Sequence, residues 1–239
     1  MQQDYLIAGL RVRMDTFGRA QEQAEPYLAV AAGEPDIVIQ SDPRKIQEKQ
    51  PFLSLEECEY LSTGSSFYWQ LLQFGGLLLH ASAVVLDGYA YLFSAPCGTG
   101  KSTHTRLWQE TFGQAAILLN DDKPALRKED GCWYAYGTPW SGKTAENKNM
   151  RAPVGGICVL SRGESNEIAP FGGKDAVFAL LTQTARPASR EARDTLLALL
   201  DDLMQTVPVW QLSCTPTVEA ALVSQKAMAA EAYRRFGGG

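Results

Sequence analysis

The segment Ala95–Ser102, with the sequence APCGTGKS, constrains the fold of this chain more than any other feature. Glycines at positions 98 and 100 let successive backbone N–H groups turn inward around phosphate oxygens, and a following helix presents its positive N-terminal end there. Ala95 stands where this pattern usually has its first glycine, a position that mainly starts the turn. The segment therefore predicts a phosphate-binding loop, with a chance match in an ordinary loop as the alternative.

The sequence on either side of the segment predicts the required strand–loop–helix context. Residues 77–86 are an apolar run typical of a buried strand, and Asp87-Gly88 is a strong hairpin signal. Residues 89–94 then return as a strand that leads into the loop, and a helix is expected from Ser102 to Phe112. This context favours a site for a nucleoside triphosphate.

Each residue of the loop has an expected part in binding. Lys101 is expected to reach the β- and γ-phosphates, and Ser102 to give its hydroxyl to Mg²⁺. We therefore expect ATP and Mg²⁺ as ligands. The expected nucleotide contacts are Pro96, Cys97, Gly98, Thr99, Gly100, Lys101, Ser102 and Thr103.

Two aspartates follow the next predicted strand. Asp121 and Asp122 come after an apolar run at residues 115–119, where a metal-binding carboxylate of such a site belongs. We expect one carboxylate to hold Mg²⁺ and the other to accept a proton, and the sequence leaves open which is which. The alternative is a solvated turn or a helix cap, because Asp is common before a pair such as Lys123-Pro124.

Three further residues are candidates for the same site. His80 interrupts an apolar run, so it is either a core histidine with a partner or a group directed at the site. Lys143 and Arg151 flank a polar loop and are candidates to stabilise the charge that develops during group transfer, with solvated side chains as the alternative. His104, in the first turn of the expected helix, is assigned to packing or to the surface.

The remaining pattern divides the chain into two parts. Residues 1–65 are predicted to form a small β-rich N-terminal region, with strands at 5–14 and 36–40 and a charged loop at 42–50. Residues 66–236 are predicted to form a P-loop kinase-like catalytic domain. Further strands are expected at 132–136, 155–160 and 210–214, and further helices at 174–183, 190–206 and 217–236.

Composition excludes several classes of partner. The net charge of −5 argues against a general nucleic-acid surface, and no apolar stretch approaches the length of a membrane helix. Five cysteines without a CxxC pair indicate neither a disulfide framework nor a zinc knuckle. The first residues do not resemble a secretory signal, so we expect a cytoplasmic protein. The oligomeric state stays open, a homo-oligomer included.

Taken together, His80, the segment Ala95–Thr103 and Asn120–Asp122 resemble the catalytic domain of HPr serine kinases, which are relatives of phosphoenolpyruvate carboxykinase. In that family a histidine precedes the loop lysine by a similar separation, and paired aspartates follow. The resemblance implies an α/β fold with a mixed central β core and flanking helices, and it favours His80 as a site residue. It covers roughly residues 77–160, and residues 137–143 look like the stretch after the aspartates in short bacterial HPr-kinase-like proteins.

The expected function is transfer of the γ-phosphate of ATP to a hydroxyl, with serine in a peptide or protein as the expected acceptor. The signatures of the larger HPr kinases outside this region are not recognisable, so HPr itself is not assigned as the acceptor. One alternative is a carboxykinase-like or small-molecule kinase acting on a small acid or free serine, with Lys143 and Arg151 as its anion pocket. The other is a nucleotide sensor without transfer.

Overall fold

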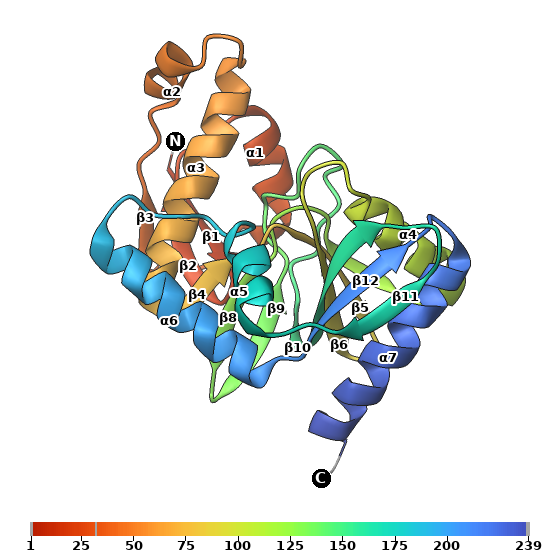
Figure 1. The fold of residues 1–239 in the computed structure, drawn as a ribbon. Coiled ribbons are helices and arrows are strands. Elements are labelled where there is room, and N and C mark those ends of the chain that lie inside the picture. Colours follow the sequence, from red (N-terminus) through yellow and green to blue (C-terminus); the bar gives the residue numbers. More distant parts are fainter. Residues whose placement is uncertain (1, 32, 238–239) are drawn as a thin grey trace.

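The computed structural model describes residues 2–31 and 33–237 of the chain. Within these ranges the chain forms a three-stranded N-terminal sheet and a nine-stranded mixed sheet, with helices around both (Figure 1). The strands are β1 (Gln3–Ile7), β2 (Leu10–Met14), β3 (Ile37–Ile39), β4 (Gly76–Leu78), β5 (Ala81–Leu86), β6 (Tyr89–Ser94), β7 (Ile117–Asn120), β8 (Ala125–Glu129), β9 (Cys132–Tyr136), β10 (Arg151–Arg162), β11 (Glu167–Pro170) and β12 (Val209–Cys214). The helices are α1 (Gly18–Ala24), α2 (Pro43–Lys49), α3 (Leu55–Leu71), α4 (Lys101–Phe112), α5 (Gly173–Leu181), α6 (Arg190–Thr206) and α7 (Val218–Phe236).

Strand β10 joins the two halves of the large sheet. Its first residues pair with β9 in antiparallel fashion, its middle pairs with β6 in parallel, and its last part pairs with β12 in parallel. The register with β6 shifts between Val154 and Gly156, and a Cβ at Gly155 would lie 2.9 Å from the ring of Tyr91. The sheet curls along β10, in the order β4-β8-β9-β10-β6-β5-β7 with β12 and β11 beside β10. The expected mixed α/β fold is confirmed.

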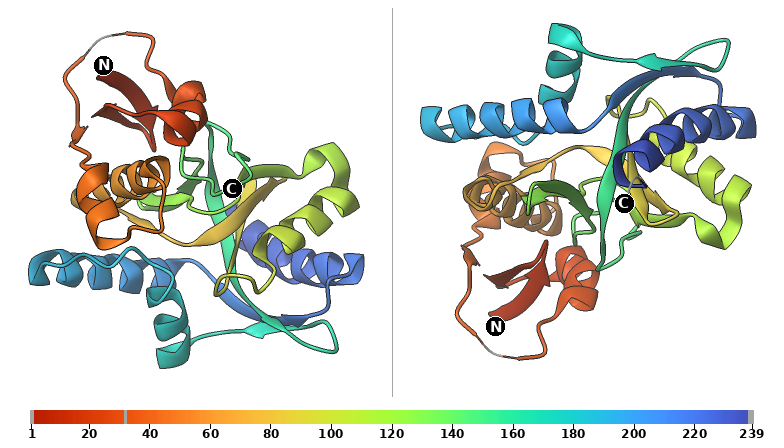
Figure 2. Two further views of the ribbon diagram at one scale, coloured as in Figure 1. Left: turned by 90° about the horizontal axis from the view of Figure 1, so that it is seen from above. Right: turned by 90° about the horizontal axis from the view of Figure 1, so that it is seen from below.

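Helices cover both faces of the part of the sheet that contains β6 (Figure 2). Because successive side chains of a strand point to opposite faces, β6 divides its residues between two cores. Tyr91 and Phe93 pack with Trp108 of α4 and with α7. Ala90 and Leu92 pack on the other side, in the cluster that contains the leucines of α6. The loop after β6 is therefore carried by a strand that is fixed on both faces.

The N-terminal region shares a hydrophobic core with the rest of the chain. Helix α3 begins at a capping box between Ser54 and Glu57 and runs across the predicted boundary at residues 65 and 66. Its buried face joins Tyr5 of the small sheet to Trp140, which lies in the loop after β9. The two predicted parts are thus packed together through one helix.

Two local predictions are wrong. The predicted loop at residues 42–50 contains helix α2, because Pro43 fits the first helical position and the side chain of Asp42 accepts the N–H of Lys45 at 3.2 Å. The predicted single strand at residues 77–86 is two strands, β4 and β5, which are separated at Leu79 and His80. None of the helices in residues 2–31 and 33–237 combines the length and apolarity needed to cross a lipid bilayer.

Candidate functional site

The glycine-rich loop lies between β6 and α4, in the predicted strand–loop–helix order. Gly98 and Gly100 have φ angles of 78° and 126°, in the region that side chains disfavour and glycine adopts freely. Helix α4 begins after Gly100 without a side-chain cap. Its first N–H groups and the positive end of its dipole are therefore directed at the loop, where they can bind an anion.

Lys101 is the first residue of α4 and is only 8% exposed. Its Nζ atom donates a hydrogen bond to the carbonyl oxygen of Ala95 at 3.0 Å, so the side chain reaches back across the loop. Burial lowers the pKa of the ammonium, and the nearby carboxylates of Asp122 and Asp121 partly oppose this shift. The lysine thus shares one electrostatic environment with the acid pair.

Asp121 is buried directly after β7 and is held by hydroxyl groups. Its Oδ1 atom accepts a hydrogen bond from Ser82 at 2.8 Å, and its Oδ2 atom accepts one from Thr144 at 3.2 Å. The hydroxyl of Ser82 also lies 2.8 Å from that of Thr105 on α4. Asp121 is therefore linked to the helix that follows the glycine-rich loop.

Asp122 has charged partners instead. The Nε2 atom of His80 lies 2.9 Å from its Oδ1 atom, and Lys123 pairs with its Oδ2 atom. Burial raises the pKa of this carboxyl, but hydrogen bonds and charge from His80 and Lys123 outweigh the effect and lower the pKa to about 2. Asp122 is consequently ionised throughout the physiological range.

The break between β4 and β5 positions His80. Its backbone N–H donates to the carbonyl of Gln183 at 2.7 Å, and its own carbonyl accepts the hydroxyl of Ser94 at 3.0 Å. These bonds replace the strand ladder at this residue and connect it to the last residue of β6. The sequence suggested a histidine inside a strand, whereas the structure has one between strands, paired with Asp122.

Asn120 separates the two aspartates. Its side-chain oxygen accepts the N–H groups of Asp122 and Lys123 at 3.0 and 2.7 Å, which forms a turn directly after β7. Its amide group donates to the carbonyl of Thr138 at 2.9 Å. This turn gives the neighbouring carboxylates different surroundings, one of hydroxyls and one of cations.

The loop after β9, residues 137–149, closes the other side of the acid pair and is held by the N-terminal region. Gln23 of α1 is 4% exposed; its amide group donates to the carbonyl of Gly142 at 3.0 Å, and its oxygen lies 3.5 Å from the backbone nitrogen of Ser141. The N–H of Gly142 donates to the hydroxyl oxygen of Tyr60 at 2.8 Å. Residues far apart in the sequence therefore fix this loop.

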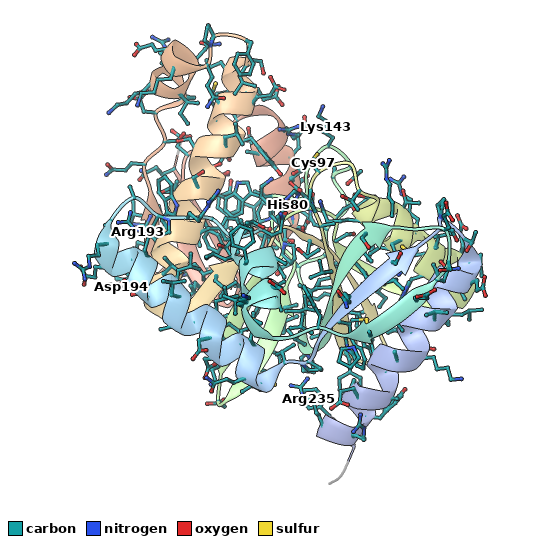
Figure 3. All side chains as sticks on the ribbon, in the orientation of Figure 1. His80, Cys97, Lys143, Arg193, Asp194 and Arg235 are labelled. Atoms are coloured by element: carbon teal, nitrogen blue, oxygen red, sulfur yellow. The ribbon has the colours of Figure 1, made fainter. Side chains whose placement is uncertain are left out.

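The structure separates Lys143 from Arg151. Lys143 is exposed on the loop, and Figure 3 shows it at the same upper edge of the view as Cys97. Arg151 begins β10, pairs with Glu129, donates to the hydroxyl of Tyr136 at 2.9 Å and is stacked on a tyrosine of β9. Arg151 is thus engaged with strands β8 and β9, and the two cations do not form a joint pocket.

His104 has the packing role assigned to it. It is 2% exposed, its Nε2 atom lies 3.0 Å from the hydroxyl of Ser224, and its ring packs on Phe93. Burial lowers its pKa to about 4, so the ring is neutral. His104 fixes α4 against α7 and takes no part in the acid pair.

Arg162 belongs to the site and was not predicted. It donates to the carbonyl of Gly98 at 2.6 Å and lies 3.5 Å from that of Thr99. Strand β10 runs parallel to β6, so the last residue of β10 reaches the same edge of the sheet as the loop. The only signal in the sequence is a charged residue after a buried strand, which becomes informative once the pairing of β10 with β6 is known.

A cavity of about 420 Å³ lies beside the loop. Its wall contains apolar side chains of α4 and of the strand ends, and polar groups lie at the loop and at Arg162. The apolar lining residues are Leu107, Leu160 and Pro216. The volume falls within the range of sites for small molecules and cofactors.

The donor set for a metal is limited. In the part of the chain that the structure describes, no three side chains of His, Cys, Asp or Glu form a group that could hold a metal ion. Magnesium usually binds to one or two carboxylates and completes its shell with water and phosphate oxygens. Ser102, Asp121 and Asp122 fit that kind of site, and they do not fit a closed, all-protein metal centre.

The fold and the site define a mixed α/β protein with a glycine-rich strand–loop–helix unit beside paired aspartates. The sequence family described as SynChlorMet cassette protein ScmC matches residues 56–219, more than half of the chain, and the chain belongs to this family. Comparison with curated proteins gives no match. Among solved structures, the HPr(Ser) kinase/phosphatase from Coxiella burnetii is similar with a TM-score of 0.37 and 13% identity, over 64% of this chain and 98% of that one. A likeness this weak does not establish an activity.

Proposed function

We propose that this chain is a phosphotransferase that moves the γ-phosphate of ATP to a hydroxyl group of an acceptor, with serine in a peptide or protein as the expected acceptor. The observation that carries the proposal is the arrangement of Lys101 and the uncapped start of α4 beside an acid pair in which His80 is bonded to Asp122. Phosphoryl transfer depends mainly on charge neutralisation and alignment, and these groups supply both.

The two aspartates suit different tasks. Asp121 is buried and held by hydroxyls, so its position is fixed and its carboxylate carries no paired cation. It is therefore our candidate ligand for Mg²⁺, together with Ser102. Asp122 is less buried, its side chain being 21% exposed, and it is ionised and oriented by His80. It is our candidate to accept the proton of the acceptor hydroxyl.

The transfer step follows from these assignments. The acceptor oxygen forms a bond to the γ-phosphorus while the bond from that phosphorus to the bridging oxygen breaks, and ADP leaves with the bonding electrons. The hydroxyl proton passes to Asp122 late in the step, which suits a carboxylate of low pKa because little proton transfer is needed early. Lys101 neutralises charge on the transferred group, and bound Mg²⁺ would add further neutralisation of the phosphate oxygens.

The cavity beside the loop is our candidate site for the nucleoside. It is continuous with Gly98 and Gly100, so a triphosphate bound in the loop can extend into it. Its apolar residues Leu107 and Leu160 suit the faces of a base, and the neutral ring of His104 adds no charge to the wall. Arg162 lies between the cavity and the loop, where a cation favours phosphate.

The decisive experiment separates binding from turnover. The chain is incubated with ATP, Mg²⁺ and serine-containing peptides, and phosphopeptide is measured by mass spectrometry for the wild type and for Asp122→Asn. We expect kcat to fall about 1,000-fold in the variant, the range for loss of an acid–base group, with ATP affinity nearly unchanged. Asp194→Asn, on the exposed face of α6, is the matched control. Equal turnover in Asp122→Asn would refute the assignment of this residue, and tight ATP binding without any product would favour a nucleotide sensor.

A further inference from the structure

Arg19 has a cationic group without an anionic partner. Its guanidinium lies over the ring of Tyr60, with Cζ 4.1 Å from the ring centroid. Its Nε atom is buried and has no hydrogen-bond partner, and no ion pair among the described residues involves its guanidinium. Buried polar groups almost always have a partner, because an unpaired one costs free energy in the folded state. An arginine left in this state indicates a missing ligand.

The position of Arg19 connects it to the acid pair through Tyr60. The hydroxyl oxygen of Tyr60 accepts the N–H of Gly142. Gly142 is in turn close to Asp122, since a Cβ built on the glycine would lie 3.1 Å from the Cβ of that aspartate. The ammonium of Lys123, which pairs with Asp122, lies 5.4 Å from the centroid of the same tyrosine ring. Arg19 is therefore on the acceptor side of the site.

The charges around Arg19 leave room for one more anion. Glu56 uses its Oε1 atom to accept the backbone N–H of Arg19 at 2.6 Å, and Glu57 is engaged in the capping box with Ser54. Neither carboxylate forms an ion pair with the guanidinium. Lys143, exposed on the neighbouring loop, adds a second cation without an ion pair among the described residues, and its charge acts on Glu57. The two neighbouring acids are thus committed elsewhere.

We infer that Arg19 is the anion-recognition residue of the acceptor site, and that the acceptor carries a carboxylate close to its reactive hydroxyl. Arginine suits this task because its planar group can donate two parallel hydrogen bonds to one carboxylate. The inference rests on the proposed function, which locates the acceptor hydroxyl at Asp122. The carboxylate has two sources: that of a free hydroxy amino acid such as serine, or an acidic side chain beside the serine of a peptide.

Binding measurements test the inference without requiring turnover. Calorimetry is done with wild type and Arg19→Gln in the presence of Mg²⁺ and a non-hydrolysable ATP analogue. One arm compares the blocked peptide Ala-Glu-Ser-Glu-Ala with Ala-Gln-Ser-Gln-Ala, and the other compares L-serine with L-serinamide. In one arm we expect the wild type to bind the carboxylate form about tenfold more tightly than the amide, and Arg19→Gln to reduce this preference to about twofold or less, as expected for loss of a charge-assisted hydrogen bond.

Two controls keep the outcome interpretable. Arg190→Gln, whose side chain is 91% exposed on α6, should retain the full preference, and Arg19→Lys should retain part of it. Equal binding of acid and amide by the wild type in both arms would overturn the inference, as would an unchanged preference in Arg19→Gln. Acid-selective binding without phosphorylated product would keep the anion site and refute the kinase. Transfer without acid preference would do the reverse.

Discussion

The two sides of the acid pair are built in opposite ways. The glycine-rich loop, its strand and its helix occupy one continuous stretch, residues 89–112, and their order can be predicted from that stretch. The loop at 137–149 is held instead by side chains such as Gln23, Tyr60 and Asn120, which are distant in the sequence. The difference teaches that the first side is fixed by local backbone geometry, whereas the second depends on tertiary packing.

Replacing the loop lysine tests the local side, with the largest expected effect of the three that follow. In Lys101→Met the ammonium that crosses the loop is lost, and we expect the Kd for ATP to rise about 100-fold, the upper range for a hydrogen bond to a charged group. Calorimetry with ATP and Mg²⁺ measures it. Lys174→Met, at the exposed start of α5, should bind ATP as the wild type does. Unchanged affinity in Lys101→Met would mean that this stretch is no nucleotide site.

Replacing Gln23 tests the other side. Gln23→Leu leaves the carbonyl of Gly142 without its donor, so we expect the free energy of unfolding to fall by about 1–2 kcal/mol. Misplacement of the loop should lower kcat/KM for the acceptor about tenfold while the Kd for ATP stays the same. Urea denaturation and steady-state kinetics measure these quantities, and the exposed Gln21→Leu on the same helix is the control. A parallel loss of ATP affinity would show that the two sides are not independent.

The acid dependence of stability gives the smallest effect and tests the contrast within the acid pair. The pKa of Asp122 is lowered in the folded chain to about 2 from the ordinary value of 3.8, so its contribution to stability is present above pH 4 and is lost as the pH falls toward 2. The stability of the wild type relative to Asp122→Asn should therefore fall by about 1 kcal/mol between pH 5 and pH 3. Urea denaturation at each pH measures this difference. A difference that is constant with pH would contradict the lowered pKa.

How much the sequence predicts follows the same division. The bounds of β9 and α6, at 132–136 and 190–206, agree with the structure because hydrophobic periodicity marks them. The strand–loop–helix unit agrees because glycine and hairpin signals are local. The conjunction of His80 with the acid pair was suggested by resemblance, and the structure brings His80 to Asp122.

Other parts could not be predicted, for physical reasons. Arg162 depends on the parallel pairing of β10 with β6, which one strand's sequence does not specify. Gln23 and Arg19 lie in a short polar helix whose contacts arise only when α3 packs the N-terminal sheet against Trp140. The proposed pairing of Arg151 with Lys143 does not form because Glu129 and Tyr136 engage Arg151 across adjacent strands.

The N-terminal sheet and the large sheet share no strand within the described residues, so they communicate through side chains and α3 alone. The match to the ScmC family begins at residue 56, whereas Arg19 and Gln23 lie upstream of it. We therefore expect the upstream segment to behave as an exchangeable selectivity cassette. A chimaera that carries residues 1–55 from another member of the family would change which acceptor is used and keep the affinity for nucleotide, because the grafted segment contacts the loop at 137–149 and leaves residues 89–112 intact.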